Sequence, residues 1–341
     1  MKDLKILGIV VAFALILYYG VEPFAHSQMH KHVEFKGFKY KDLKDIPKGD
    51  PKKGETLAAS CAGCHSIKAA GMKAPMDAMA SSAAYGVNPP DLSLAGKMLD
   101  EKFFANFLVN PAKVTKSKHF AMPPSAGSLQ DAADIVAYFK EVAKKAEETT
   151  ETEAKKIANE KVEKLKKSGI KVSQNESKEI VAKTVKNAKN KEAFVFACGR
   201  CHADRYGKWT QLGDVPKTKP DINTGVDLAK IDFQKNLGAY QIKLAKYMGK
   251  LPPDLSIIVR ARSEDYLKTF VEDPQTQLPG TAMPRVGLTN EGYEEVLGYL
   301  ESTGDPSKEK RESTAPWVIG FFVIFTLLAY GWYKSQWKGL H

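Results

Sequence analysis

The 341-residue chain has only four cysteines, and none lies outside two short stretches. These stretches are SCAGCHSIK at 60–68 and FACGRCHAD at 196–204, and both contain the order Cys-x-x-Cys-His. Without scattered cysteines, the disulfide framework of a small secreted domain is disfavoured. A structural zinc site needs four ligands, whereas each pentad supplies three. A thioredoxin-type redox pair does not require the histidine that follows.

The order Cys-x-x-Cys-His is the attachment signal for c-type haem. Two cysteine sulfurs bond to the haem vinyl groups, and the adjacent histidine reaches the iron from the same turn. We therefore predict two covalently bound haem c groups. The thioether and proximal ligands are Cys61, Cys64 and His65 in the first pentad, and Cys198, Cys201 and His202 in the second.

Residues 141–191 lack aromatic residues, proline and cysteine, but contain 14 lysines and 9 glutamates. Such a segment cannot bury a core of its own. Pairs such as Glu160–Lys164 are spaced four apart in the order that favours a helix. We predict a solvated, largely helical connector that breaks at Ser168-Gly169.

The blocks on either side of this connector look like copies of one another. From the methionine of the AMP motif to a helix tyrosine is 16 residues in both (138 − 122 and 299 − 283). Matched order and near-equal spacing predict a domain repeat. The second copy has 26 extra residues before its PPDLS (50 − 24), which we expect to form a surface lobe. The shared landmarks are PPDLS at 89–93 and 252–256, VNP and EDP ending at Pro111 and Pro274, AMPP and AMPR at 121–124 and 282–285, and the helices DIVAYFKEV and EEVLGYLES.

We assign Met122 and Met283 as the distal iron ligands. A thioether is a soft, neutral donor that favours ferrous iron, and the proline after each methionine stiffens the loop. Core packing is the commoner fate of a methionine, so rivals remain open. The rivals are Met248 in the second block, and Met72, Met76, Met79, Met98 and His119 in the first. His119 would give a bis-histidine haem of lower potential. Met72, Met76 and Met79 are expected on one helical face, where packing is favoured over a copper site.

The second ring nitrogen of each proximal histidine needs an acceptor to fix its orientation. A proline carbonyl in each PPDLS segment suits this role, at Pro90 and Pro253, and Leu92 and Leu255 would then face the porphyrin. Iron held by both histidine and methionine leaves no open position for a substrate. The pattern therefore favours an electron carrier, with no substrate site of its own, over a dihaem peroxidase.

Both ends of the chain are apolar. Residues 6–21 carry no charge, which is typical of an export signal, cleaved after residue 27, or of a retained short anchor. We favour retention. Residues 317–333 are also uncharged and have tryptophans near both ends, which favours a membrane span over a buried core helix, with Pro316 in its first turn. Because covalent c-haem is made outside the cytoplasmic membrane, we expect haem domains on the periplasmic side of the cell inner membrane.

The remaining charge and histidines are less specific. The formal charge of +11 suits an acidic protein partner or an anionic membrane surface, and no module for nucleic acid accompanies it. The stretch before the first block has His26, His30 and His32, which we interpret as a polar segment at the membrane surface in preference to a metal site.

The stretch LPPDLSIIVRARSEDYL, residues 251–267, resembles the haem domain of cytochrome c1 from quinol–cytochrome c oxidoreductases, the bc1 complexes. The C-terminal anchor lies where that family has its own, so the resemblance covers about residues 190–338. It implies that Cys198, Cys201, His202 and Met283 hold the haem, and that Arg260 or Arg262 pairs with a haem propionate. Ordinary cytochrome c1 lacks the N-terminal haem domain, so the whole chain is similar to the dihaem cytochrome c subunits of some bacterial bc complexes.

This resemblance implies cytochrome b and a Rieske iron–sulfur protein as partners, in a dimeric complex, with a periplasmic cytochrome c or a terminal oxidase as acceptor. The alternatives are a dihaem subunit of a C-family (cbb-type) haem–copper oxidase, a dihaem peroxidase and a structural membrane tether. The predicted fold is mainly α, with two class I cytochrome c-like haem domains joined by a charged helical linker and flanked by transmembrane helices. The expected segments are 1–27, signal or anchor; 28–47, juxtamembrane; 48–145, first haem domain; 146–188, linker; 189–306, second haem domain; 315–334, C-terminal anchor; and 335–341, cytoplasmic tail.

Overall fold

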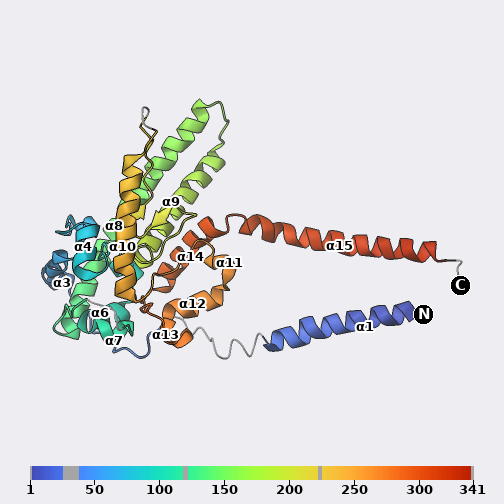
Figure 1. Cartoon of the computed structure of the whole chain (residues 1–341), viewed down its shortest axis with the longest axis horizontal. Helices are drawn as coiled ribbons and strands as arrows, with labels where there is room; N and C mark the ends of the chain where they lie inside the picture. The colour runs from blue at the N-terminus through green and yellow to red at the C-terminus, as the bar shows by residue number, and fades with distance from the viewer. Residues whose placement is uncertain (1, 26–37, 118–121, 222–224, 339–341) are drawn as a thin grey trace.

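The computed structural model describes residues 2–25, 38–117, 122–221 and 225–338, and it is mainly helical, as predicted (Figure 1). Four histidines named above lie outside the described residues, namely His26, His30, His32 and His119. Within the described part, the only sheet is a hairpin of β1 and β2.

The body of the protein consists of two units, each built around one pentad. The first unit contains α3 (Pro51–Ala58), η2 (Ala59–Gly63), η3 (Lys68–Ala70), α4 (Ala78–Tyr85), α5 (Ala95–Met98), α6 (Glu101–Val109), α7 (Pro111–Thr115) and the start of α8 (Leu129–Lys167). The second contains the end of α9 (Gln174–Ala197), β1 (Trp209–Thr210), β2 (Gly213–Asp214), α10 (Leu228–Met248), α11 (Ile258–Ala261), α12 (Glu264–Glu272), α13 (Pro274–Gln277) and α14 (Asn290–Gly304).

Corresponding helices of the two units begin and end in the same way. Both α6 and α12 have nine residues, and each starts at a capping side chain, Asp100 or Ser263, that accepts a backbone N–H. Each ends two residues before a proline that opens the next short helix, Pro111 in α7 and Pro274 in α13. The repeat expected from the sequence is therefore present in the local structure.

The two units pack directly against each other, because buried side chains from both belong to one continuous cluster. Phe103 and Phe139 come from the first unit, and Phe194 and Tyr299, whose rings stack 4.4 Å apart, come from the second. Apolar contact of this kind holds the units together without any need for the connector.

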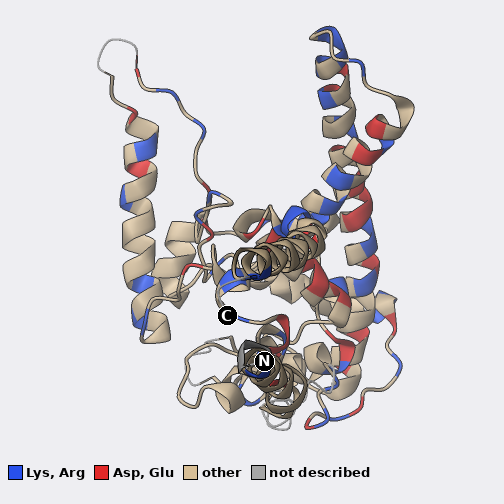
Figure 2. Ribbon diagram, turned by 90° about the vertical axis from the view of Figure 1, so that its right-hand side faces the viewer, with Lys and Arg blue, Asp and Glu red and all other residues tan. Residues whose placement is uncertain are grey.

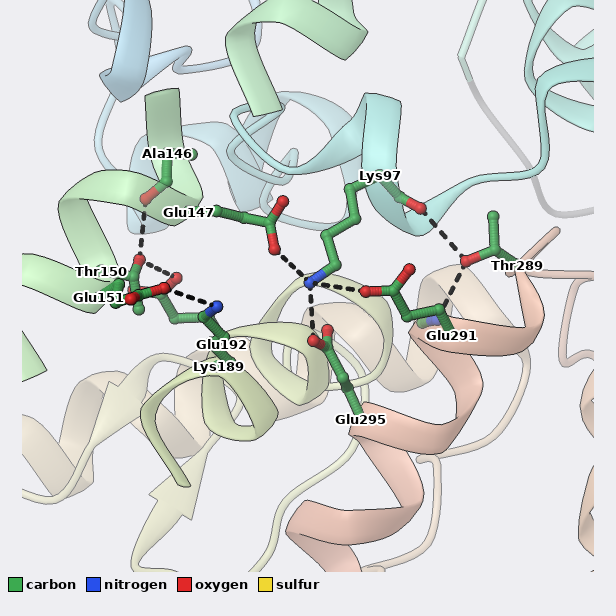
Figure 3. Close-up of polar contacts among 11 residues, drawn as sticks. Lys97, Ala146, Glu147, Thr150, Glu151, Lys189, Glu192, Thr289, Glu291 and Glu295 are labelled. Carbon is green, nitrogen blue, oxygen red and sulfur yellow. Dashed lines mark hydrogen bonds and ion pairs between the residues drawn. The ribbon is translucent and has the colours of Figure 1, made fainter. Parts of the chain in front are cut away.

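Polar contacts also cross between the units. Lys97 of α5 is 11% exposed and meets Glu147 of α8 at 2.6 Å and Glu295 of α14 at 2.7 Å. Figure 3 shows how these side chains converge from three helices, with Glu291 at 3.5 Å. The backbone carbonyl of Lys97 also accepts a hydrogen bond from the Thr289 hydroxyl at 3.2 Å.

The charged connector folds back on itself as a hairpin of α8 and α9, and these two helices project from the body (Figure 1). The break lies at Ser168-Gly169, as predicted, and Gly169 has the positive φ of 82° that favours glycine. Lysine and glutamate cover the outer surfaces of both helices (Figure 2). The inward stripe of α8 is made of small residues four apart, and its members are Ala146, Thr150, Ala154, Ala158 and Val162.

Residues 38–47, within the predicted juxtamembrane segment, pack against the body. The Tyr40 side chain is buried, and its hydroxyl donates to the Leu288 carbonyl at 3.1 Å. Asp42 pairs with the buried Arg285 at 2.7 Å. This segment thus contacts the second unit directly.

The two terminal helices are long and apolar enough to cross a membrane, and both leave the body on the same side (Figure 1). At the N-terminus, α1 (Lys2–Ile16) and η1 (Leu17–Val21) lead into a helix that continues to Ala25. At the C-terminus, α15 (Lys308–Gln336) starts eight residues before Pro316. Pro316 therefore lies inside the helix, and its predicted place in the first turn is wrong. The apolar surfaces are exposed, which is consistent with membrane anchoring.

Candidate functional site

Each pentad forms one tight turn that brings its cysteines and its histidine together. In the first, the His65 N–H donates to the Cys61 carbonyl at 2.9 Å, and the Cys64 N–H donates to the same oxygen at 3.1 Å. In the second, the N–H groups of His202 and Cys201 bond to the Cys198 carbonyl at 2.9 and 3.1 Å. The four cysteines form no disulfide with one another.

The proline carbonyls predicted as histidine acceptors are in place. His65 Nδ1 lies 2.9 Å from the Pro90 carbonyl oxygen, and His202 Nδ1 lies 2.7 Å from that of Pro253. Since a carbonyl only accepts, Nδ1 carries the proton and Nε2 is the nitrogen available to a metal. Burial lowers the pKa of both histidines, so the neutral form that can bind a metal is favoured.

A clasp of four further hydrogen bonds lies where the residues just after each pentad meet the PPDLS segment, and it is the same in both units. Three of the bonds join the two stretches, and the fourth, from the serine N–H to the aspartate, lies within PPDLS. In the first, Asp91 accepts from the N–H groups of Lys68 and Ser93, and in the second Asp254 accepts from those of Arg205 and Ser256. In the first unit, the Leu92 N–H also donates to the Ser66 carbonyl, and the Ala69 N–H donates to Ser93 Oγ. In the second, the Leu255 N–H donates to the Ala203 carbonyl, and the Tyr206 N–H donates to Ser256 Oγ.

Burial also governs the chemistry of the thiols. It raises the pKa of Cys61 and Cys201, and that of Cys198 to about 12. The thiolate needed for zinc binding or disulfide exchange is therefore disfavoured. A thioether is uncharged, so conversion of these thiols to thioethers tolerates the same burial.

The structure sets Met122 and Met283 in half-buried positions. Met122 packs against the main core, and the Met283 N–H donates to Thr281 Oγ1 at 3.4 Å. Their coordination of iron remains a prediction. Of the rivals, Met98 is buried in the core and Met248 is buried on α10.

The predicted single helical face of three methionines is wrong. The helix α4 begins only at Ala78, so Met72 and Met76 both precede it. Met72 instead forms a backbone bridge with Ile67, which excludes helical geometry at that position. Met79 lies on α4 and packs in a second, smaller cluster with α10.

The other predicted pocket residues differ in their burial. Leu92 and Leu255 are half-buried against the main core, and their place beside a porphyrin remains a prediction. Arg260 is exposed and lies near Asp305, whose pKa it helps to lower after the larger effect of Arg311. The guanidinium of Arg262 is exposed and stacks on the Tyr266 ring at 5.3 Å. Pairing of either arginine with a propionate therefore remains a prediction.

Arg200, inside the second pentad, is a candidate site residue that sequence reasoning missed. Its Nη1 is buried without a hydrogen-bond partner among the described residues, and its charge is close enough to His65 to lower the pKa of that histidine. An anion such as a haem propionate would satisfy it. Paired thiols, oriented neutral imidazoles and this buried guanidinium nitrogen together fit a haem group. The position of Arg200 between two cysteines was the only signal available.

These features define the class of the protein. The cytochrome c family model matches residues 51–143, which include the first pentad and its PPDLS clasp. Residues 51–143 therefore form a cytochrome c domain, which implies covalently bound haem c there. Together with the weak similarity to cytochrome c1, this domain indicates an electron-transfer c-type cytochrome.

Two curated relatives are similar to this chain over less than half of its length. The chain is 23% identical over 209 residues to cytochrome c1 of Allochromatium vinosum, covering 43% of this chain and 82% of the relative. It is 25% identical over 196 residues to the ammonia monooxygenase gamma subunit of Nitrosomonas europaea, covering 44% of this chain and 81% of the relative. No solved structure gives a significant match.

Proposed function

We propose that this protein is a dihaem c-type cytochrome, with the second haem attached to Cys198 and Cys201. The observation that carries the proposal is the clasp, because both pentads have the same acceptor for histidine and the same four further hydrogen bonds. A repeat of the haem-binding geometry is expected only if the second pentad performs the same chemistry as the first. Met122 and Met283 are the proposed distal ligands.

We further propose that the chain is the cytochrome c subunit of a quinol-oxidising bc1-type complex. Supporting this are the LPPDLSIIVRARSEDYL stretch, the C-terminal apolar helix α15, and the similarity to cytochrome c1. Cytochrome b and a Rieske iron–sulfur protein would be its partners in a dimeric complex. Both units would lie on the periplasmic side of the inner membrane, where covalent haem attachment takes place.

The proposed order of electron transfer is quinol, Rieske centre, the His202 site, the His65 site, and then a periplasmic cytochrome c or a terminal oxidase. The cytochrome c1-like features belong to the second unit, which favours that unit as the entry point. Direct packing of the two units supports exchange within one chain.

Replacement of the distal methionines tests this order. Met283→Leu should block reduction of both sites by quinol, because the entry site loses the ligand that raises its potential. Met122→Leu should slow only delivery to the acceptor. Stopped-flow visible spectroscopy of the purified complex would measure both steps. The order is wrong if Met122→Leu alone prevents reduction of both haems.

Purification of the membrane complex in mild detergent tests the assignment to a bc1 complex. We expect cytochrome b and a Rieske centre to co-purify, and quinol to reduce the c-type haem through them. Co-purification with a copper oxidase, and indifference to quinol, would instead favour the haem–copper oxidase subunit.

A further inference from the structure

The helix α10 contacts both units, although it begins in an insertion that the first unit lacks. Three residues four apart on one face of α10 are buried, Tyr240, Leu244 and Met248. They form a small cluster of their own with residues of both units. Partners from the first unit are Met79 and Val87, and those from the second are Cys201, Leu212 and Ala282. The insertion was expected to form a surface lobe, and most of its described residues from 217 to 232 are exposed. Only the C-terminal half of α10, which follows, packs against both units.

The Tyr240 hydroxyl joins the two haem-binding loops. It accepts a hydrogen bond from the Asn88 N–H at 3.1 Å and donates one to the Arg200 carbonyl at 3.3 Å. Asn88 is two residues from Pro90, the acceptor for His65, and Arg200 is two residues from His202. One fully buried hydroxyl thus connects the backbone segments that orient both proximal histidines.

Other contacts fix α10 on both sides of this hydroxyl. On the first unit, Tyr247 lies so close to Gly86 that a Cβ there would be 2.7 Å from its ring. On the second, Gln241 donates to Gln211 at 3.1 Å, and Gln211 donates to the Cys201 carbonyl at 3.4 Å. Burial raises the pKa of Tyr240 to about 12, so the phenol keeps the proton that it donates to Arg200.

We propose that Tyr240 is a positioning residue that sets the spacing of the two haem sites and thereby the rate of electron exchange between them. This inference rests on the proposed dihaem function. Loss of the hydroxyl would leave the Asn88 N–H and the Arg200 carbonyl buried and unpaired, which loosens α10 from both loops. Electron exchange falls steeply with distance, so small increases in spacing slow it measurably.

The test uses the full-length protein with its haems in detergent, and the variant Tyr240→Phe, which removes the hydroxyl and keeps the ring. The matched control is Tyr293→Phe. Tyr293 is also buried, at 3% exposure, but its hydroxyl has no hydrogen-bond partner among the described residues. Exchange broadening of haem methyl resonances in half-reduced protein reports the exchange rate, and hydrogen exchange of the Asn88 amide reports the local contact.

In Tyr240→Phe we expect several-fold slower exchange between the haems, faster hydrogen exchange at Asn88 and an unchanged haem content. Tyr293→Phe should match the unsubstituted protein in all three. Two haems per chain with an unchanged exchange rate in Tyr240→Phe, or equal slowing in Tyr293→Phe, would overturn this inference alone. One haem per chain in the unsubstituted protein would overturn the dihaem function and this inference with it.

Discussion

At the residue scale, Asp91 and Asp254 occupy the same place in the two units. Each accepts two backbone N–H groups of the clasp through its carboxylate. Asp91 accepts a third hydrogen bond from the Ser66 hydroxyl at 2.6 Å, directly after the proximal histidine. The aspartate of PPDLS is therefore a structural anchor for the histidine loop.

The variant Asp91→Ala should destabilise the first unit by about 1.5–3 kcal/mol, since hydrogen bonds to a charged group are lost and their donors are left unpaired. Chemical denaturation, followed through the haem absorption, would measure the change. Asp45→Ala is the control, because Asp45 is almost fully exposed and, among the described residues, pairs with Lys102 alone. A clasp without importance for stability would give both variants the same unfolding midpoint.

A second prediction concerns Lys97 and its three glutamates. Burial opposes the charge of Lys97, but hydrogen bonds and ion pairs with Glu147 and Glu295 outweigh it and raise the pKa of the lysine. A raised pKa in the folded state means that the stabilisation is fully present below the ordinary value of 10.5 and is lost as pH rises through the raised value.

Unfolding free energies of the unsubstituted protein and of Lys97→Met, measured from neutral to alkaline pH, test this. We expect Lys97→Met to be less stable at neutral pH, where three carboxylates lose their common cation, and the difference to shrink above pH 10.5. Lys102→Met serves as the control for loss of an exposed ion pair. A pH-independent difference would contradict the role of the charge.

Some of these residues could be predicted from the sequence and others could not. The pentads follow from chemistry that needs fixed local spacing, so a short motif was sufficient. The Pro90 and Pro253 carbonyls lie 25 and 51 residues from their histidines, but the PPDLS motif that recurs after both pentads marked them. Tyr240 belongs to one copy of the repeat only, and its partners are 152 and 40 residues away in the sequence. Without a recurring motif to mark it, this contact depends on tertiary packing that the sequence pattern does not indicate.

At the element scale, the hairpin of α8 and α9 depends on a narrow seam of small residues. Ala158 is fully buried in this seam, whereas the neighbouring Ile157 is 60% exposed. Charged residues from the two helices add contacts across it, such as Lys189 to Glu151 at 3.0 Å. The composition predicted a solvated helix, but the alanines also let two charged helices pack closely.

Substitution of Ala158 and Ile157 distinguishes the buried contact between α8 and α9 from the exposed surface of the hairpin. Ala158→Glu should destabilise the hairpin by about 3 kcal/mol, because it forces a carboxylate into a close helix contact. Ile157→Glu should change little, since its side chain already faces water. Hydrogen exchange of α8 and α9 amides would report local opening. Equal protection in both variants would show that the helices do not pack as a seam.

Helix boundaries were less predictable than helix positions. The break at Ser168-Gly169 is correct because a left-handed residue at a helix end favours glycine. The start of α15 was misplaced because proline favours the first turn but does not forbid an interior position. The segment before Pro316, KEKREST, is compatible with a helix, and the Arg311–Asp305 ion pair at 2.7 Å holds its first turns against the body.

At the scale of the whole molecule, the two units share one core, and α10 packs against both of them. The connector therefore does not set the distance between the sites. The apolar helices α1 and α15 leave the body on the same side (Figure 1), so both would enter one membrane with the two units on its surface. This arrangement suits a membrane-anchored carrier that exchanges electrons within one chain.

The central claim is that the second pentad binds haem as the first does. The direct test is the haem content per chain, from the pyridine haemochrome spectrum and the mass of the intact protein, for the unsubstituted chain and for a Cys198→Ser, Cys201→Ser variant. The account predicts two haems in the first and one in the second, attached at Cys61 and Cys64. A single haem in the unsubstituted chain, with Cys198 and Cys201 still free thiols, would contradict it.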